Sequence, residues 1–390
     1  MLGFKKSHVK KASNYQYFMS SFKKILFISS VAFLFLIGCN SKKQASFRIS
    51  GKINSLKNTY ILLHKIEDYQ QSQTSLIDSI YINKKGEFNS IYFLQPAIYT
   101  LQIATKKITL AIDHKQQIVL KGSSINDLNI TGSTDTDLLN QYEKYREESL
   151  NRLVTSVRTQ IKKLQNNDVP NEEIIRLRAL EVENYQKHLN ELVNFVKNKM
   201  GVSIAIYPTS LRWNNENLPF LKELVLNFEN KHGPINITQQ LKDKIKLLEK
   251  TNIGSHVLPI EMPSKNGQII SLNSVKKRVT LIDFWASWCP PCRTESILLN
   301  SLYKDYNSKG FEIYGVSLDT NKDRWLKALE TDQRTWVNVS TLKGFNTPIA
   351  KEYGIAALPT NFLIDVEGKI IAQNIHGEQL KQKIKEVFEN

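Results

Sequence analysis

Two of the three cysteines in this 390-residue sequence are spaced for thiol–disulfide chemistry. Cys289 and Cys292 are separated only by Pro290-Pro291. Two cysteines three positions apart at a helix start can close a disulfide with little backbone movement. Unpaired N–H groups and the helix dipole favour a thiolate at Cys289, whereas Cys292, one turn deeper, keeps its proton longer. The motif predicts that Cys289 attacks a substrate disulfide and that Cys292 then resolves the mixed disulfide.

The second attack needs a proton acceptor, and two carboxylates are candidates. Asp283 lies in the apolar run Val279–Trp285, and Glu295 follows Cys292 by one helical turn. A carboxylate in so apolar a run is costly unless it has a function, and burial raises the pKa of a carboxyl group. Either residue could accept the proton, directly or through water. Trp288, next to the first cysteine, is expected to contact the substrate, and the alternative is that it only covers the site.

The elements around the motif predict an α/β domain. Val279–Trp285 has the continuous apolar pattern of a strand buried on both faces. Asn266-Gly267 predicts a hairpin between Leu258–Met262 and Gln268–Leu272. The remaining expected elements are a helix from about Pro291 to Tyr306, a strand at Glu312–Ser317, a helix near Lys322–Thr331, strands at Thr360–Ile364 and Lys369–Gln373, and a last helix from about Glu378 to Phe388.

Two further regions precede this domain. Alternating apolar residues from Phe47 to about Gly132 predict short strands in a small antiparallel sandwich or barrel-like fold. Helical stripes at Tyr142–Leu164 and Ile175–Val196 predict a helical hairpin, followed by two shorter helices at Leu218–Phe228 and Thr238–Leu248. We therefore expect a leader over 1–38, a β-rich domain over 39–134, a helical segment over 135–252 and the α/β domain over 253–390.

The N-terminus has the pattern of an export signal. Lys23 and Lys24 precede the apolar run Ile25–Gly38, which is short for crossing a bilayer. The run ends in Leu36-Ile37-Gly38-Cys39, which resembles the bacterial lipobox. This resemblance implies a signal peptide, lipid modification of Cys39, and a lipoprotein that faces the periplasm from a membrane, with the outer membrane favoured. An uncleaved membrane anchor is the alternative, and Met19 competes with Met1 as the start.

The segment Leu281–Glu295 and the later Leu358-Pro359-Thr360 together resemble the TlpA/ResA-like thiol–disulfide oxidoreductases of the thioredoxin superfamily. The resemblance is specific over roughly the last 135 residues and implies a thioredoxin-like fold there. The β-rich domain and the helical segment more weakly resemble the N-terminal regions of related envelope lipoproteins. The first resemblance matches Asp283 to the buried acid of thioredoxins and Glu295 to a glutamate of ResA-like members. It also implies a cis bond before Pro359 that leaves the Leu358 backbone free to pair with a substrate strand. Implied partners are disulfide-containing exported proteins and a membrane thiol-transfer donor of electrons.

Several other functions compete with that of a disulfide reductase. The formal charge of +16 includes six lysines before Cys39, and the remaining charges are interleaved, so nucleic-acid binding is not expected. No metal site and no cofactor are expected, because neither a ligand cluster nor a nucleotide or flavin fingerprint occurs. Pro290-Pro291 contains no histidine, which favours a reductant over an oxidant. A disulfide isomerase, a peroxiredoxin-like peroxidase (disfavoured by Ala286, where threonine is expected) and a non-catalytic docking lipoprotein remain open alternatives.

Overall fold

The first part of the chain forms two four-stranded β-sheets. The computed structural model describes residues 47–69, 71–165 and 171–389, so the expected signal run and Cys39 lie outside the described residues. One sheet has the order β4-β1-β7-β8 and the other β3-β2-β5-β6. The strands are β1 (Phe47–Ile53), β2 (Thr59–Asp68), β3 (Gln73–Ile82), β4 (Glu87–Tyr92), β5 (Ala97–Ile103), β6 (Lys106–Ile112), β7 (Gln116–Gly122) and β8 (Asn129–Thr131).

The two sheets enclose one apolar core, as expected of a sandwich. Alternate residues of each strand are buried, among them Ile49, Ile61, Leu101 and Ile118. Most strand pairs are antiparallel, as predicted, but β1 and β7 run parallel. A parallel pair needs a long connection, and here the whole run from β2 to β6 lies between the two strands. The sequence patterns missed β4 and β8.

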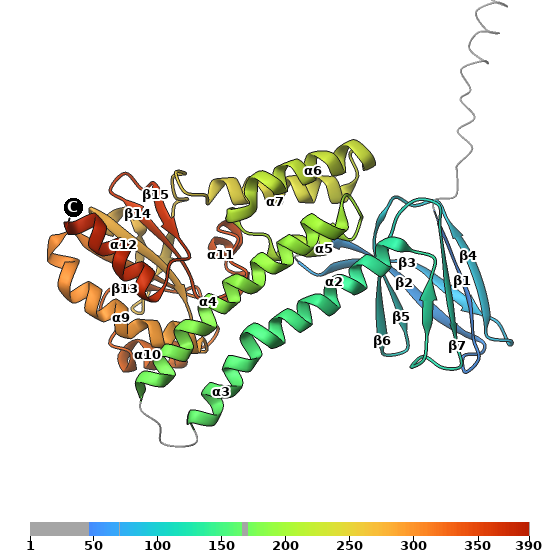
Figure 1. The fold of residues 1–390 in the computed structure, drawn as a ribbon, viewed down its shortest axis with the longest axis horizontal. Coiled ribbons are helices and arrows are strands. Elements are labelled where there is room, and N and C mark those ends of the chain that lie inside the picture. Colours follow the sequence, from blue (N-terminus) through green and yellow to red (C-terminus); the bar gives the residue numbers. More distant parts are fainter. Residues whose placement is uncertain (1–46, 70, 166–170, 390) are drawn as a thin grey trace, which may run out of the picture. The chain divides into compact units, whose positions relative to one another are not determined.

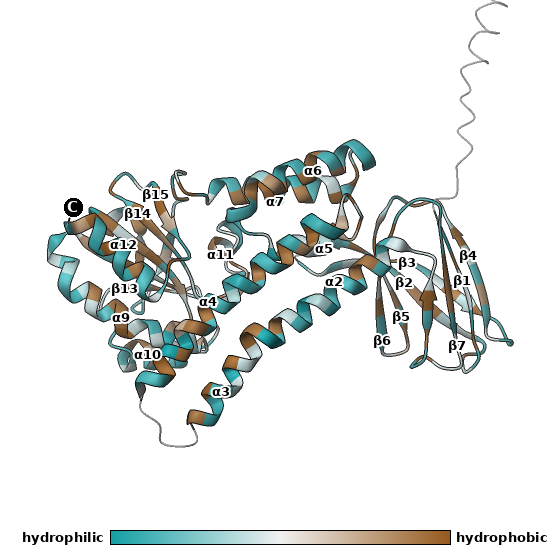
Figure 2. Cartoon of the chain, viewed as in Figure 1, coloured by the Kyte–Doolittle hydropathy of each residue, from teal (hydrophilic) through white to brown (hydrophobic). Residues whose placement is uncertain are grey.

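Helices follow the sandwich and pack on its second sheet. Two of them, α2 (Thr134–Leu150) and α3 (Ser156–Gln165), are joined by the π-helical turn Asn151–Thr155. After α4 (Asn171–Phe195) and a second π turn (Val196–Met200) come α5 (Ile206–Thr209), α6 (Leu218–His232) and α7 (Asn236–Lys250). Ile98 and Ala111 of the sheet share a core with these helices. Figure 2 shows polar and apolar residues side by side along α6 and α7, as expected of helices with one buried face.

The C-terminal region has a five-stranded mixed sheet of order β13-β12-β11-β14-β15. Strands β11, β12 and β13 are parallel to one another, whereas β14 runs antiparallel to β11 and β15 runs antiparallel to β14. A separate hairpin of β9 and β10 turns at Gly267, whose φ of 82° suits a glycine. The elements are β9 (Glu261–Pro263), β10 (Ile269–Ser271), α8 (Leu272–Val275), β11 (Val279–Trp285), α9 (Pro290–Tyr306), β12 (Phe311–Ser317), α10 (Lys322–Thr331), β13 (Val337–Val339), α11 (Pro348–Glu352), β14 (Thr360–Asp365), β15 (Ile370–Gln373) and α12 (Gly377–Glu389).

Helices cover both faces of this sheet (Figure 1). All seven residues of β11 are buried, because successive side chains point into cores on opposite faces. Leu281 packs with residues of α9 and α12, whereas Ile282 packs with residues of α11 and the β9–β10 hairpin. This arrangement is the thioredoxin-like fold that the motif implied, and the predicted elements from Val279 onward are present, with the short strand β13 as an addition.

Among the residues that the structure describes, no helix has the length and apolar character needed to cross a membrane. The domain boundaries predicted from sequence remain a prediction.

Candidate functional site

The two motif cysteines lie where strand β11 gives way to helix α9. Cys289 is the N-cap of α9, and its Sγ accepts a hydrogen bond of 3.3 Å from the N–H of Cys292. A disulfide joins the two residues, whose Cα atoms are 5.3 Å apart. Both residues are more than nine-tenths buried, with 4% of Cys289 and 1% of Cys292 exposed. The sulfur of Cys289 therefore lies at the end of the helix where backbone N–H groups favour negative charge.

The loop before β14 lies next to the cysteines. Its Leu358–Pro359 peptide bond is cis, as the family resemblance implied. Within the described part of the chain, neither the N–H nor the C=O of Leu358 makes a hydrogen bond. Thr360, which follows Pro359, begins the strand that pairs with β11, and its hydroxyl donates to the carbonyl of Ala357. The loop thus presents an unpaired backbone segment close to the motif.

Asp283 is buried and has a charged partner. Its Oδ2 accepts a hydrogen bond of 2.8 Å from Nη1 of Arg334, a residue far from the cysteine motif in the sequence. Arg334 also donates to the Cys292 carbonyl (3.1 Å) and to Oγ of Ser296 (2.9 Å). Its guanidinium lies 3.8 Å from the ring centroid of Trp285. Burial raises the pKa of the Asp283 carboxyl, although the positive charge of Arg334 opposes this effect.

Glu295 has a cationic partner as well. Its Oε2 lies 2.8 Å from Nδ1 of His376, and its Oε1 accepts from the N–H of Gly377. Burial by itself would lower the pKa of His376, but the neighbouring carboxylates Glu295 and Asp283 outweigh this effect and raise it. The Nε2 atom of His376 is buried and has no hydrogen-bond partner among the described residues. Two buried pairs, Asp283 with Arg334 and Glu295 with His376, therefore accompany the helix that carries the cysteines.

Neither candidate acid is bonded to sulfur in this disulfide-linked form. Over the described residues, the hydrogen bonds of Asp283 and Glu295 go to Arg334, His376 and Gly377 and not to Cys289 or Cys292. The path from Asp283 to the motif runs through Arg334 to the carbonyl of Cys292. Sequence reasoning missed both Arg334 and His376, because no local motif surrounds either residue.

Trp288 projects outward beside the first cysteine. About half of it is exposed (49%), and its ring centroid lies 6.0 Å from that of Phe345. The preceding residue, Ser287, is held by Asp319, which accepts from its N–H (3.0 Å) and its hydroxyl (2.5 Å). The loop is therefore anchored while the tryptophan at its tip remains accessible.

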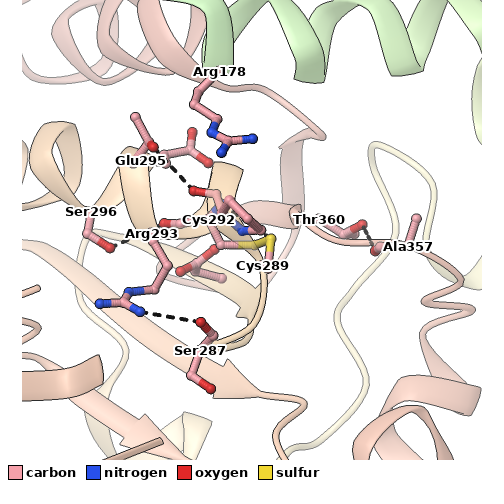
Figure 3. The surroundings of a disulfide bond; sticks show 12 residues. Arg178, Ser287, Cys289, Cys292, Arg293, Glu295, Ser296, Ala357 and Thr360 are labelled. Atoms are coloured by element: carbon pink, nitrogen blue, oxygen red, sulfur yellow. Dashed lines mark hydrogen bonds between the residues drawn. A yellow bond between two sulfur atoms is a disulfide. The ribbon is translucent and has the colours of Figure 1, made fainter. Parts of the chain in front are cut away.

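A groove of about 170 Å³ borders the motif. Pro291 and the cis-proline loop, with Leu358 and Pro359, line one part of it, and Val182 and Tyr185 of helix α4 line another. Figure 3 shows the side chain of Arg178, also from α4, reaching toward the disulfide. A segment that precedes the cysteines by about a hundred positions thus borders the site, which the sequence patterns did not indicate.

Comparison with known proteins identifies the family. Residues 253–373 match the AhpC/TSA family. The thiol-disulfide oxidoreductase ResA of Bacillus thuringiensis subsp. konkukian is 36% identical over 138 residues, which make up 35% of this chain and 78% of that protein. The chain belongs to the ResA family of thiol-disulfide oxidoreductases. ResA of Bacillus subtilis is 29% identical over 124 residues, or 32% of this chain and 67% of that protein.

Solved structures of similar proteins match about a third of the chain. A thiol-disulfide oxidoreductase from Bacteroides fragilis matches with 36% identity and a TM-score of 0.32, over 34% of this chain and 99% of that one. The thioredoxin domain of a thiol-disulfide oxidoreductase from Bacteroides vulgatus matches with 34% identity and a TM-score of 0.34, over 35% of this chain and 98% of that one. The part that matches ResA makes up 35% of the chain, so a large additional region accompanies it.

Proposed function

We propose that this chain reduces disulfides of exported proteins in the bacterial cell envelope through Cys289 and Cys292. The Cys289 thiolate attacks one sulfur of the client disulfide, and the other client sulfur leaves as a thiolate. Cys292 then loses its proton and attacks Sγ of Cys289, which releases the second client thiolate. The client gains two electrons, and the chain is left with the Cys289–Cys292 disulfide.

The observation that carries this proposal is the position of the Cys289–Cys292 disulfide. It lies at the N-terminus of α9, where a thiolate is favoured, and beside a Leu358–Pro359 bond that is cis. The unpaired N–H and C=O of Leu358 can form a short β-type pairing with an extended client segment. An exchange reaction needs both a nucleophilic sulfur and a means of holding the client disulfide in line with it.

The neighbouring residues receive roles that follow from their contacts. Asp283 acts through Arg334, which holds the carbonyl of Cys292, and is thus a positioning residue. Glu295, with His376, is the proton acceptor when Cys292 becomes a nucleophile, because this pair can hold a proton close to helix α9. Exposed Trp288 offers an apolar surface to the client.

The cellular setting follows from the N-terminal sequence. A lipid on Cys39 would tether the mature chain to a membrane, with the outer membrane favoured, and the remaining residues would face the periplasm. Each catalytic cycle leaves a disulfide in the chain, so the chain needs an external electron donor. A membrane thiol-transfer protein is the donor class that fits this requirement.

The reduction potential of the Cys289–Cys292 couple tests this function. The purified full chain is equilibrated in dithiothreitol or glutathione buffers, and the dithiol fraction is measured by alkylation and mass spectrometry. A value near that of thioredoxin, about −270 mV, supports a reductase. A value near about −120 mV indicates a disulfide donor and rejects the proposed direction. A couple that cannot be cycled leaves the docking lipoprotein as the better interpretation, and turnover of hydrogen peroxide favours the peroxidase.

A further inference from the structure

Helix α4 contributes a charged wall to the groove beside the disulfide. The groove is lined on this side by Glu181, Val182, Tyr185 and Gln186 of α4 and by Arg158 of α3. Val182 and Tyr185 contribute apolar and aromatic surface to the groove, as do Pro291 and Pro359. The groove therefore combines apolar surface with a small set of polar groups, which is the usual composition of a binding site.

The charge of this wall is centred on Glu181. This residue is almost completely buried (3% exposed), and each of its carboxylate oxygens binds one arginine. Oε1 lies 2.6 Å from Nε of Arg158, and Oε2 lies 2.8 Å from Nη1 of Arg178. Two guanidinium groups and one carboxylate carry a formal net charge of +1. A buried carboxylate with two arginine partners fixes the positions of both cations.

The two arginines differ in what they can still bind. The side chain of Arg178 is largely buried (12% exposed) and reaches toward the disulfide (Figure 3). The side chain of Arg158 is 58% exposed, and its two terminal nitrogens make no hydrogen bond to any residue that the structure describes. These nitrogens remain available to a carboxylate on a molecule in the groove, and a guanidinium can hold a carboxylate with two parallel hydrogen bonds.

We propose that this groove is the client-binding site of the chain, and that Arg158 makes it select extended segments with an acidic residue near the reactive cysteine. The inference rests on the proposed disulfide exchange and adds its substrate preference. The client backbone pairs with Leu358, and apolar client side chains contact Pro291, Val182 and Tyr185. The client carboxylate binds the exposed guanidinium. The helical segment thereby acts as a specificity element for the α/β domain.

Two matched peptides test this preference. Each is a fluorogenic, extended peptide with one disulfide, and they differ only in carrying Glu or Lys close to the reactive cysteine. The detergent-purified full chain reduces both, with dithiothreitol as electron source, and kcat/KM is compared. We expect the wild-type chain to prefer the Glu peptide about threefold, a typical size for one partly exposed ion pair, and to lose this preference in high salt. Arg158→Gln should abolish the preference, and Arg158→Glu should reverse it.

Arg176 provides a matched control. It is an exposed arginine of α4 that also pairs with a glutamate, Glu173, but it is not among the residues that line the groove. Arg176→Glu makes the same charge change and should keep the preference for the Glu peptide. Circular dichroism establishes that each variant is folded, and Arg158→Gln, which adds no second carboxylate beside Glu181, provides the test if Arg158→Glu does not fold.

The outcomes separate this inference from the proposed function. Hydroxyethyl disulfide, which is small and uncharged, serves as a third substrate. If the wild-type chain reduces it and also reduces both peptides at equal rates, the groove assignment is overturned but the reductase function stands. An equal loss of preference in Arg176→Glu and Arg158→Gln also overturns it, because the effect would then come from overall charge. A wild-type chain without activity on any of the three disulfides rejects the proposed function itself.

Discussion

Nη1 of Arg334 lies 2.8 Å from Oδ2 of Asp283, and both side chains are almost completely removed from solvent. The same guanidinium binds the carbonyl of Cys292, so the buried acid is connected to the active-site helix by a positive charge. Burying two charges is favourable only when they pair well and their remaining hydrogen-bonding groups are satisfied. The contacts of Arg334 with Ser296, Cys292 and the ring of Trp285 meet this requirement.

Replacing Arg334 with Met should destabilise the chain strongly, because it leaves Asp283 buried without a counter-charge. We expect the free energy of unfolding to fall by about 3–5 kcal/mol at neutral pH, as measured by urea denaturation. The double variant Asp283→Leu/Arg334→Met removes both charges and should regain most of this loss. A single variant as stable as the wild type would mean that the Asp283–Arg334 ion pair does not contribute to the fold.

His376→Gln should change how stability depends on pH. The pKa of His376 is raised in the folded chain above its ordinary value of 6.5, so protonation favours folding. This contribution is fully present below about pH 6.5 and is lost as pH rises through the folded-state pKa. The difference in unfolding free energy between wild type and His376→Gln, measured by urea denaturation across this range, should therefore be largest at acidic pH.

His114→Gln serves as the control for this measurement, since His114 is an exposed histidine in the sandwich region. It should leave the pH profile of unfolding unchanged. A wild-type advantage over His376→Gln that grows from pH 6 to pH 9 would contradict the protonated pair with Glu295.

Cys292→Ser should stop the exchange after its first step. Without the second thiol, the Cys289–client disulfide has no internal nucleophile to resolve it and should accumulate. Nonreducing electrophoresis and mass spectrometry with a disulfide-containing client should detect the adduct, and dithiothreitol should release it. Cys289→Ser should form no such adduct. If Cys289→Ser instead accumulates the client adduct, Cys292 is the attacking thiol and Cys289 the resolving one.

Trp288→Ala should affect client binding more than folding. The side chain is half exposed, so its loss should change the free energy of unfolding by no more than about 1 kcal/mol. Loss of an exposed aromatic surface beside Cys289 should raise KM for a protein client several-fold. Ile269→Ala removes a similarly exposed apolar side chain from the β9–β10 hairpin and is the control. Equal KM values for both variants would count against a client contact at Trp288.

The sequence by itself was sufficient for the elements that carry the motif. Three local signals each determine backbone conformation over a few residues: the mainly apolar run of β11, the Pro-Pro pair at the start of α9 and the X-Pro bond before β14. Strand β13 and the parallel pairing of β1 with β7 were not apparent. Strand β13 has only three residues. The pairing of β1 with β7 depends on which sheet β7 joins after a long connection.

Only the tertiary structure decided which side chains surround the cysteines. Arg334 reaches Asp283 across 51 positions, and His376 reaches Glu295 across 81. Residues of helix α4, which are still more distant in the sequence, border the groove. Local propensity and periodicity contain no information about such pairs, because a buried charge finds its partner through chain folding rather than through sequence spacing. The two cysteines thus specified the chemistry, whereas the fold supplied the charges that surround it.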